Sequence, residues 1–216
     1  MVIEGGKYKK FPRTPHLPWS EGATEDDKTL SSVEHFRGHK VIVTEKLDGE
    51  NTTMYNDHVH ARSINSKAHW SRAWVKNKWS KVRHMIPSNV RVCGENMYAV
   101  HSIVYTDLPS YFIGFAIFED DICLEWSATV DFLERLDISP PPVFFEGMFD
   151  EEMIRSILTE ADYETCEGYV VRLQEPFHYN NFADSVAKFV RPNHVQTDDH
   201  WMRTGNEVNM LQVSKG

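Results

Sequence analysis

The chain has 216 residues, enough for one substantial domain. Hydrophobic residues make up 41% and charged residues 25%, which is ordinary for a soluble globular protein. The net charge of −9 excludes a protein that coats nucleic acid over its whole surface. There is no N-terminal apolar segment and no apolar run of membrane-spanning length. The cysteines form no Cys-x-x-Cys pair, so we expect buried free thiols and a cytoplasmic location without membrane contact: Cys93, Cys123 and Cys166.

Residues 1–37 are expected to form a docking segment followed by a helix. Three prolines prevent a regular helix over the first twenty residues. The hydrophobic residues among them favour a segment that packs on the domain over a disordered basic tail: Phe11, Leu17 and Trp19. Thr24 and the carboxylates that follow it predict a helix start, and Gly38 predicts its end near Phe36.

The chain is organised around residues 45–51 (EKLDGEN). The preceding run, 39–44, is rich in β-branched residues and predicts a strand that ends near Lys46. Lys46 and Asp48 lie two residues apart, so in an extended chain both side chains leave the same face. A lysine becomes a nucleophile when a cation, a metal or desolvation lowers its pKa. Lys46 is therefore a candidate nucleophile; the alternative is a strand-end lysine in a solvated turn.

The later segments alternate strands with inserted helices. A hairpin is expected over 52–63, and it would carry Arg62 alongside the lysine strand. Further strands are expected at 90–93, 111–119, 122–126, 143–145, 168–173 and 186–190, and helices at 127–136 and from 150. Because most of the strands are joined by short turns, we expect an α+β fold with antiparallel sheets.

Residues 66–91 form a basic segment with no acidic residue and seven cations. Tryptophans and aliphatic residues recur there at helical spacing, and Pro87 closes the predicted helix. Tryptophans at this spacing favour core packing over base stacking, which leaves the cations on a solvated face available to phosphates. The candidate nucleic-acid-binding residues are Arg72, Lys76, Lys78 and Lys81.

Residues 46–51 (KLDGEN) resemble the Lys-x-Asp-Gly-x-Asn motif of the covalent nucleotidyltransferases, which are DNA ligases, RNA ligases and mRNA capping enzymes. Further fragments follow in the family's order: 61–63 (ARS), 92–97 (VCGENM), 112–117 (FIGFAI), 167–172 (EGYVVR) and 187–191 (AKFVR). The resemblance covers about 41–191. It implies the nucleotidyltransferase fold, ATP-grasp-like, with antiparallel sheets flanked by helices.

The resemblance also implies a role for each matching residue. Lys46 would become the covalent nucleotidyl-lysine, and Lys188 and Arg172 would act with it at the α-phosphate. Glu95 would hold the ribose, and Phe115 would stack on the base. Arg62 and Asn51 would touch the ribose-phosphate region and later the acceptor 5′-phosphate. The implied nucleotide-binding set is Glu45, Lys46, Asn51, Arg62, Glu95, Phe115, Glu167 and Lys188.

The same resemblance implies ATP and Mg²⁺ or Mn²⁺ as cofactors. Glu167 would help to bind the metal, while Asp48 is either a second metal-side carboxylate or a structural hydrogen-bond acceptor. Three positions depart from the family pattern: Arg172 replaces a lysine, Ala116 stands where an acidic residue often follows the aromatic, and Arg191 is three residues from Lys188 instead of two.

DNA ligases and capping enzymes usually carry an OB-fold after the last motif, and the roughly twenty-five residues after Arg191 are too few for one. The asparagine that ends the first motif, together with 193–195 (NHV), is most similar to RNA ligases of the phage T4 RNA ligase 2 type. We expect a single nucleotidyltransferase domain over 1–216 without an OB-fold. Its core would span about 38–192 and its C-terminal tail 193–216.

The resemblance implies an ATP-dependent RNA ligase, used in RNA repair, that joins a 5′-phosphate end to a 3′-OH end. The chain would be either a minimal ligase or one whose engagement of the 3′-OH strand depends on a partner protein. Two alternatives stay open. One is a non-catalytic nucleotide- or RNA-binding module of the same fold. The other is a related transferase that forms GMP-lysine or adenylylates a different acceptor.

Overall fold

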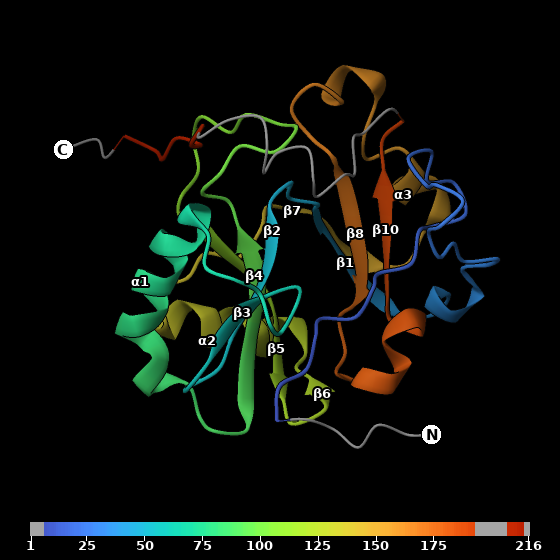
Figure 1. Cartoon of the computed structure of the whole chain (residues 1–216). Helices are drawn as coiled ribbons and strands as arrows, with labels where there is room; N and C mark the ends of the chain where they lie inside the picture. The colour runs from blue at the N-terminus through green and yellow to red at the C-terminus, as the bar shows by residue number, and fades with distance from the viewer. Residues whose placement is uncertain (1–6, 193–206, 214–216) are drawn as a thin grey trace.

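Two antiparallel sheets stand side by side in the computed structural model, which describes residues 7–192 and 207–213 (Figure 1). The four-stranded sheet, in the order β10–β8–β1–β7, contains β1 Lys40–Glu45, β7 Val143–Met148, β8 Gly168–Leu173 and β10 Val186–Val190. The six-stranded sheet, in the order β3–β2–β4–β5–β6–β9, contains β2 Glu50–Met54, β3 Val59–Ala61, β4 Val90–Asn96, β5 Phe112–Glu119, β6 Ile122–Cys123 and β9 Phe177–His178. The expected α+β class with antiparallel sheets is confirmed.

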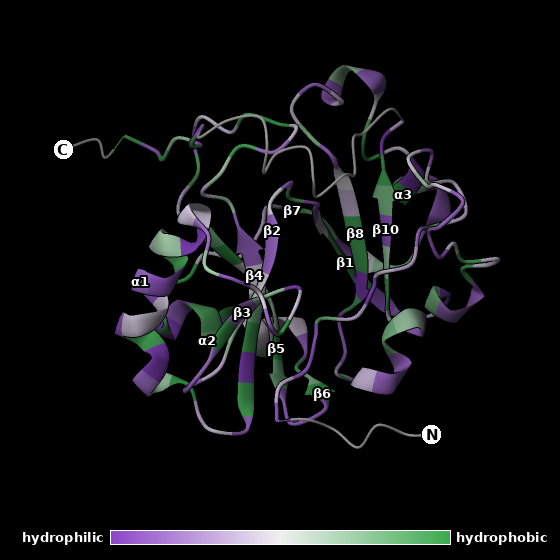
Figure 2. Cartoon of the chain, in the orientation of Figure 1, coloured by the Kyte–Doolittle hydropathy of each residue, from purple (hydrophilic) through white to green (hydrophobic). Residues whose placement is uncertain are grey.

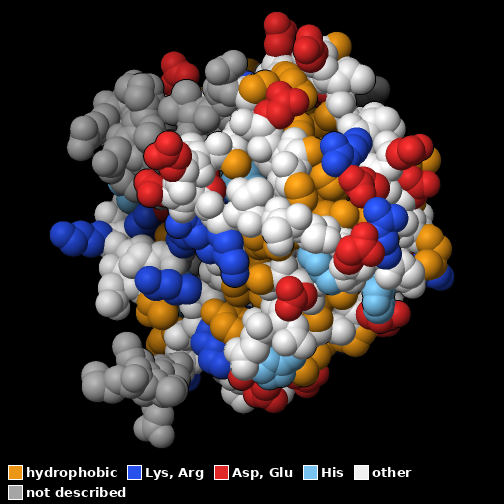
Figure 3. All heavy atoms as spheres, turned by 90° about the vertical axis from the view of Figure 1, so that its right-hand side faces the viewer, with side chains coloured by type: hydrophobic (Ala, Val, Ile, Leu, Met, Phe, Trp, Pro, Cys, Tyr) orange, Lys and Arg blue, Asp and Glu red, His pale blue; other side chains and the backbone are white. Residues whose placement is uncertain are grey.

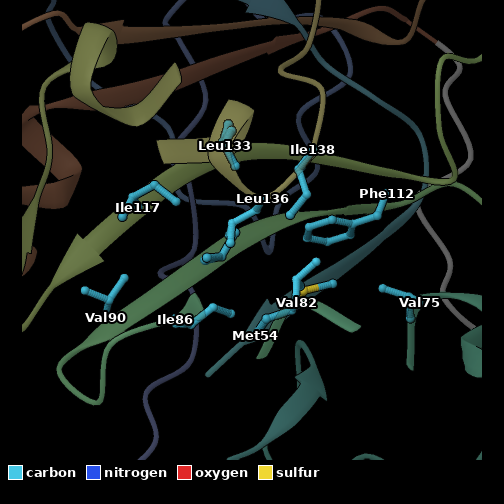
Figure 4. Close-up of a cluster of buried hydrophobic side chains, with 11 residues drawn as sticks. Met54, Val75, Val82, Ile86, Val90, Phe112, Ile117, Leu133, Leu136 and Ile138 are labelled. Atoms are coloured by element: carbon cyan, nitrogen blue, oxygen red, sulfur yellow. The ribbon is translucent and has the colours of Figure 1, made fainter. Parts of the chain in front are cut away.

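The outer face of the six-stranded sheet is covered by two helices, α1 Ala73–Val82 and α2 Trp126–Arg135. Short 3-10 turns at Trp70–Arg72 and Arg83–Met85 flank α1, so the helix expected in the basic segment is confirmed. Figure 2 shows that α1 carries both hydrophilic and hydrophobic residues, as an amphipathic surface helix does. Its hydrophobic face enters a buried cluster with residues from both helices and the sheet, including Val75, Val82, Phe112, Ile117 and Leu133 (Figure 4).

The outer face of the four-stranded sheet buries a second cluster. It combines alternate residues of the strands with residues from the N-terminal part of the chain and from α3 Glu151–Arg155: Leu17, Phe36, Val41, Val43, Ile154, Tyr169 and Phe189. The side chain of Asp150 accepts a hydrogen bond from the Met153 N–H at 3.0 Å and so caps α3. Alternation along the strands then directs the remaining residues, such as Thr44, Val170 and Lys188, toward the space between the sheets.

The N-terminal arm, residues 7–20, wraps around the edge of β10. Pro15 accepts a backbone hydrogen bond from Lys188 (2.9 Å), and Leu17 donates one back to the Lys188 carbonyl (2.8 Å). Leu17 is fully buried on the outer face, whereas Phe11 packs between the sheets with its ring 5.1 Å from that of Phe115. The arm therefore reaches from the outer face of one sheet into the space between both.

The helix expected from Thr24 to Phe36 is wrong, because only a 3-10 turn forms at Glu34–Phe36. The Asp27 carboxylate accepts a hydrogen bond from the Thr24 N–H at 3.1 Å and closes a turn instead. The Leu30 N–H then donates to the carbonyl of His16 at 2.8 Å. Pairing with the arm holds this segment extended, so tertiary contacts override its helical signals.

The hairpin β2–β3 forms, but not beside the lysine strand. It belongs to the six-stranded sheet, whereas β1 belongs to the other, so the expectation that it places Arg62 alongside β1 is wrong. The short strand β9 and the 3-10 helix Tyr179–Asp184 were not expected. The fragment 193–195 lies outside the described residues.

All three cysteines are buried and free of disulfides. In the part of the chain that the structure describes, no helix is long and apolar enough to cross a membrane.

Candidate active site

A cavity of about 510 Å³ opens between the two sheets, a volume typical of small-molecule sites. One part of its lining is polar and comes from both sheets: Lys46, Asn51, Arg62, Glu95 and Lys188. Another part is hydrophobic and aromatic: Phe115, Ala116, Trp126, Val170, Phe177 and Val186. The lysines and Glu95 lie toward the Gly168 end of β8, and Val186 is paired with Arg172 near its other end.

Lys46 directly follows β1, where its N–H donates to the carbonyl of Gly168 at 2.9 Å. A Cβ at Gly168 would collide with the backbone of Phe189, so this close meeting of strands requires glycine. Glu167, the residue before this glycine, is brought to the same place. Lys46 Nζ donates to Glu167 Oε2 at 2.6 Å, and the two side chains are only 22% and 4% exposed.

The charges around Lys46 decide its protonation. Burial disfavours its charged form, but the carboxylates of Glu167 and Glu95 outweigh burial and raise the pKa of Lys46. Lys46 is therefore an ammonium group when no other ligand is present. Lys46 can attack as a nucleophile only in its neutral form, so a positive charge must offset the carboxylates of Glu167 and Glu95 and lower its pKa.

Glu95 and Asn51 face the cavity from neighbouring strands, paired directly across β4 and β2. Burial raises the pKa of Glu95 to about 8, and the charge of Lys46 opposes that rise. The side-chain oxygen of Asn51 is buried and has no hydrogen-bond partner among the described residues. A buried acceptor left unpaired costs free energy, so this atom calls for a donor from a ligand or from water.

Lys188 projects from β10 toward the cavity, opposite Val170 of β8. Burial lowers the pKa of Lys188 to about 8, and the positive charges of Lys46 and Arg62 add to this effect. Lys46, Lys188 and the exposed Arg62 thus line one cavity, whose lining also includes Arg13 and Arg172. The arrangement is suited to a polyanion such as a phosphate chain.

Phe115 reaches the cavity because β5 contains a bulge. Cys93 of β4 pairs with Ala116 and Gly94 pairs with Gly114, which leaves Phe115 as the extra residue. A bulge re-aims side chains, and here Phe115 and Ala116 both line the cavity although they are consecutive. The aromatic surface expected at Phe115 is thus available to a planar ligand.

Arg172 lines the cavity as well, but its guanidinium is bonded to protein groups. It is 5% exposed, and its guanidinium donates to the carbonyls of Leu124 (2.8 Å) and Leu173 (3.1 Å). A third bond runs to the carbonyl of Phe115 at 3.4 Å. Arg172 therefore ties β8 to the six-stranded sheet, and we do not assign it to the α-phosphate.

Asp48 is held as a structural acceptor. Its Oδ2 accepts hydrogen bonds from the N–H of Ser102 (2.8 Å), the hydroxyl of Ser102 (2.7 Å) and the N–H of Ile103 (2.9 Å). These hydrogen bonds favour a structural role for Asp48 over a role in metal binding. Glu45, which lines the cavity as well, is half-buried, and burial raises its pKa to about 7.

The basic helix lies on the far side of the six-stranded sheet from the cavity. Arg72 is paired with Glu50, its Nε lying 2.7 Å from Glu50 Oε2, and Lys78 is paired with Asp137 at 2.9 Å. Only Lys76 and Lys81 of the four expected nucleic-acid contacts are exposed. Figure 3 shows the opposite side of the molecule from α1; there Lys and Arg side chains gather toward the left of the view, and acidic side chains are spread over the rest of that face.

The arm and the segment after it contribute cavity residues that the sequence motifs did not indicate: Phe11 and Arg13 from the arm, and Asp27 from the turn that follows it. The side chain of Arg13 is 58% exposed and lies 3.5 Å from the Asp27 carboxylate. His16 is fully buried, and burial together with the charge of Lys188 lowers its pKa to about 4. The sequence indicated this part of the cavity only through the hydrophobic residues of the proline-rich arm, which predicted that the arm packs on the domain.

Comparisons with solved structures show the same fold. Naegleria gruberi RNA ligase with PPi matches with a TM-score of 0.53 at 19% identity, over 82% of this chain and 59% of that one. A variant of that ligase with ATP and Mn matches with a TM-score of 0.55 at 18% identity, over 86% and 57%. An archaeal ATP-dependent RNA ligase matches with a TM-score of 0.53 at 13% identity, over 85% and 48%. The chain thus spans about half to three fifths of these ligases.

A search of curated protein sequences found no match. The family model described as RNA ligase, in contrast, matches residues 39–190, which include β1, Lys46 and every strand through β10. The matched region contains the polar part of the cavity and the motif residues from Lys46 to Lys188. The chain belongs to the RNA ligase family.

Proposed function

We propose that the chain is an ATP-dependent RNA ligase that works through a covalent lysyl-AMP intermediate on Lys46, in a nucleotidyltransferase fold of the ATP-grasp-like type. One observation carries this proposal: a largely buried lysine, bonded to Glu167, lies at the polar part of a nucleotide-sized cavity whose other part is hydrophobic and aromatic. The solved Naegleria ligase variant with ATP and Mn, which shares the fold, supports ATP and a divalent cation as ligands.

In the first step the Lys46 amine attacks the α-phosphorus of ATP. The proton of the ammonium form leaves through the hydrogen bond to Glu167, and the nitrogen lone pair forms the N–P bond. The bond between the α-phosphorus and its bridging oxygen breaks, and its electron pair leaves with pyrophosphate. Lys188, half-buried on the opposite strand, would stabilise the charge that develops on the α-phosphate oxygens.

The nucleotide would lie along the cavity. The base would stack on Phe115 at the aromatic part, and the ribose would meet Glu95 and the unpaired oxygen of Asn51. Arg62, exposed at the rim, would contact the phosphates and later the 5′-phosphate of the acceptor. The buried acceptor of Asn51 fits a ribose hydroxyl as its donor.

The donor set fits a divalent cation held jointly with the substrate. Among the described residues no group of three or more acidic, histidine or cysteine side chains would hold a metal alone. Mg²⁺ is commonly bound by one or two carboxylates plus substrate phosphates, and Glu167 would supply the carboxylate. A bound cation would offset the carboxylate charge that raises the pKa of Lys46.

The later steps return Lys46 to its free state. An oxygen of an RNA 5′-phosphate attacks the α-phosphorus of lysyl-AMP, the N–P bond breaks, and AMP is joined to the RNA end. A 3′-OH then attacks that 5′-phosphate and AMP leaves, while the hydroxyl proton passes to solvent. We propose that strand engagement also uses a partner protein, and that the reaction takes place in the cytoplasm.

The test is the intact mass of the protein after incubation with ATP and Mg²⁺. We expect a gain of one AMP that is lost in Lys46→Ala and kept in Lys40→Ala, a control at the exposed start of the same strand. Adenylylation retained in Lys46→Ala would refute the assignment. No gain in the wild-type chain would favour the non-catalytic binding module, and a gain with GTP would favour a guanylyl transferase.

A further inference from the structure

The C-terminal clasp, residues 207–213, packs on an irregular loop, residues 97–111, that lies between β4 and β5. Ala99 forms a bridge with Val208, and Leu108 forms one with Leu211. The loop contains no helix or strand, so its shape depends on contacts from outside. The clasp supplies such contacts.

Asn209 is the central residue of the clasp. It is 1% exposed. Its Nδ2 donates to the carbonyls of Met97 (2.7 Å) and Ala99 (3.2 Å), and its Oδ1 accepts from the N–H of Tyr105 (2.9 Å). Its backbone carbonyl accepts from the hydroxyl of Tyr111 at 2.8 Å. One buried amide thus joins three separate points of the loop.

The loop in turn holds the turn that follows Lys46. The N–H and hydroxyl of Ser102 and the N–H of Ile103 donate to Asp48 Oδ2, and the Tyr105 hydroxyl accepts from the Asp48 N–H at 3.1 Å. Leu47 packs in a cluster with Met97 from the same loop. These contacts reach Leu47 and Asp48, the two residues that directly follow Lys46 in the chain.

We propose that Asn209 is a positioning residue for the adenylylation step: by fixing the 97–111 loop it sets Asp48, and through it the place of the Lys46 amine. This inference rests on the proposed function of Lys46. The clasp touches none of the residues assigned to the ribose, the base or the phosphates, so its role is to place the attacking atom and not to bind the nucleotide.

A fixed nucleophile matters because attack needs the amine within bonding reach of phosphorus and in line with the leaving group. A displacement of about 1 Å costs on the order of 10²-fold in rate. Gly49 constrains the turn from the other side, since a Cβ there would lie 2.7 Å from the Asn96 carbonyl and 2.8 Å from Met97 Sδ. Because the turn packs this closely against the start of the loop, a shift of the loop would also move the turn.

The experiment compares two reactions of the full chain. Single-turnover formation of lysyl-AMP requires the Lys46 amine, whereas sealing of a strand supplied already adenylylated at its 5′ end does not. For Asn209→Ala we expect adenylylation to slow roughly 10- to 100-fold, ATP affinity to stay within about twofold, and sealing to stay within about twofold. Gln212→Ala is the matched control, because its side chain makes one exposed bond to the same loop.

A second variant covers the case in which Asn209→Ala does not fold. Tyr105→Phe keeps the clasp and the ring but removes the hydroxyl that accepts from Asp48. It should slow adenylylation several-fold with sealing unchanged. Equal losses in adenylylation and sealing, or no loss of adenylylation in either variant, would overturn the proposal. A wild-type chain that never adenylylates would instead refute the function of Lys46 itself.

Discussion

Replacing Arg172 with lysine separates a structural role from a catalytic one. Sequence resemblance assigned this cation to the α-phosphate, whereas the structure directs it to three backbone carbonyls. Lysine preserves the charge and much of the length but carries its donors on a single nitrogen, so it lacks the planar fork of arginine. The substitution therefore removes the planar arrangement of hydrogen-bond donors but keeps the positive charge.

The magnitude follows from the bonds that lysine cannot make. One ammonium group can satisfy one of the three carbonyls, so two bonds are lost, one of them the long contact to Phe115 at 3.4 Å. Hydrogen bonds from charged groups contribute about 1.5–3 kcal/mol each, and the long one counts at the low end, which gives a total of about 3 kcal/mol. For a domain of this size the melting temperature should fall by about 6–12 °C.

The assay measures thermal unfolding and, well below the transition, the rate of lysyl-AMP formation. We expect the large fall in melting temperature together with an adenylylation rate within about twofold of wild type. Arg155→Lys is the control, because Arg155 is exposed and pairs only with Glu151 of its own helix and the ring of Trp19. An unchanged melting temperature with a large loss of adenylylation would refute the structural role of Arg172.

Two further predictions follow from charge. Burial raises the pKa of Glu95 to about 8 from 4.5, so between about pH 5 and 8 the folded chain retains a proton that the unfolded chain has released. The free energy of unfolding should therefore fall as pH rises through this window, and less steeply in Glu95→Gln; an identical slope in denaturant titrations would contradict this. Lys76→Glu with Lys81→Glu should weaken RNA binding and reduce its logarithmic salt slope by about two. Adenylylation should be unchanged, because the six-stranded sheet separates α1 from the cavity, and a matching loss of both activities would contradict that separation.

Local sequence was sufficient to single out Lys46 as the candidate nucleophile and to predict most of the framework. The β-branched run before Lys46, the glycine next to Glu167 and the alternation in β8 and β10 act over a few residues, and each formed as expected. The resemblance alone assigned Lys188 to the site; in the structure, alternation along β10 directs its side chain toward the space between the sheets, where it lines the cavity with Lys46.

The tertiary structure decided which strands pair with each other and which elements pack against the faces of the sheets. The bulge at Phe115 depends on how β4 and β5 pair, and the position of α1 depends on which face of the sheet its tryptophans cover. The helix expected after Thr24 was lost because the arm pairs with that segment. Such outcomes depend on partners distant in sequence, which short-range patterns do not encode.

The sequence by itself determined the antiparallel α+β framework and the candidate lysine in it, because motif and periodicity are local properties. Only the folded chain decided which of the charged side chains are bonded to protein groups and which are left to face the cavity. Arg172, Arg72 and Asp48 carry the same residue types as their expected roles require, yet each is bonded to protein groups. The physical reason is that a buried charge must find partners, and those partners come from elements brought together by folding.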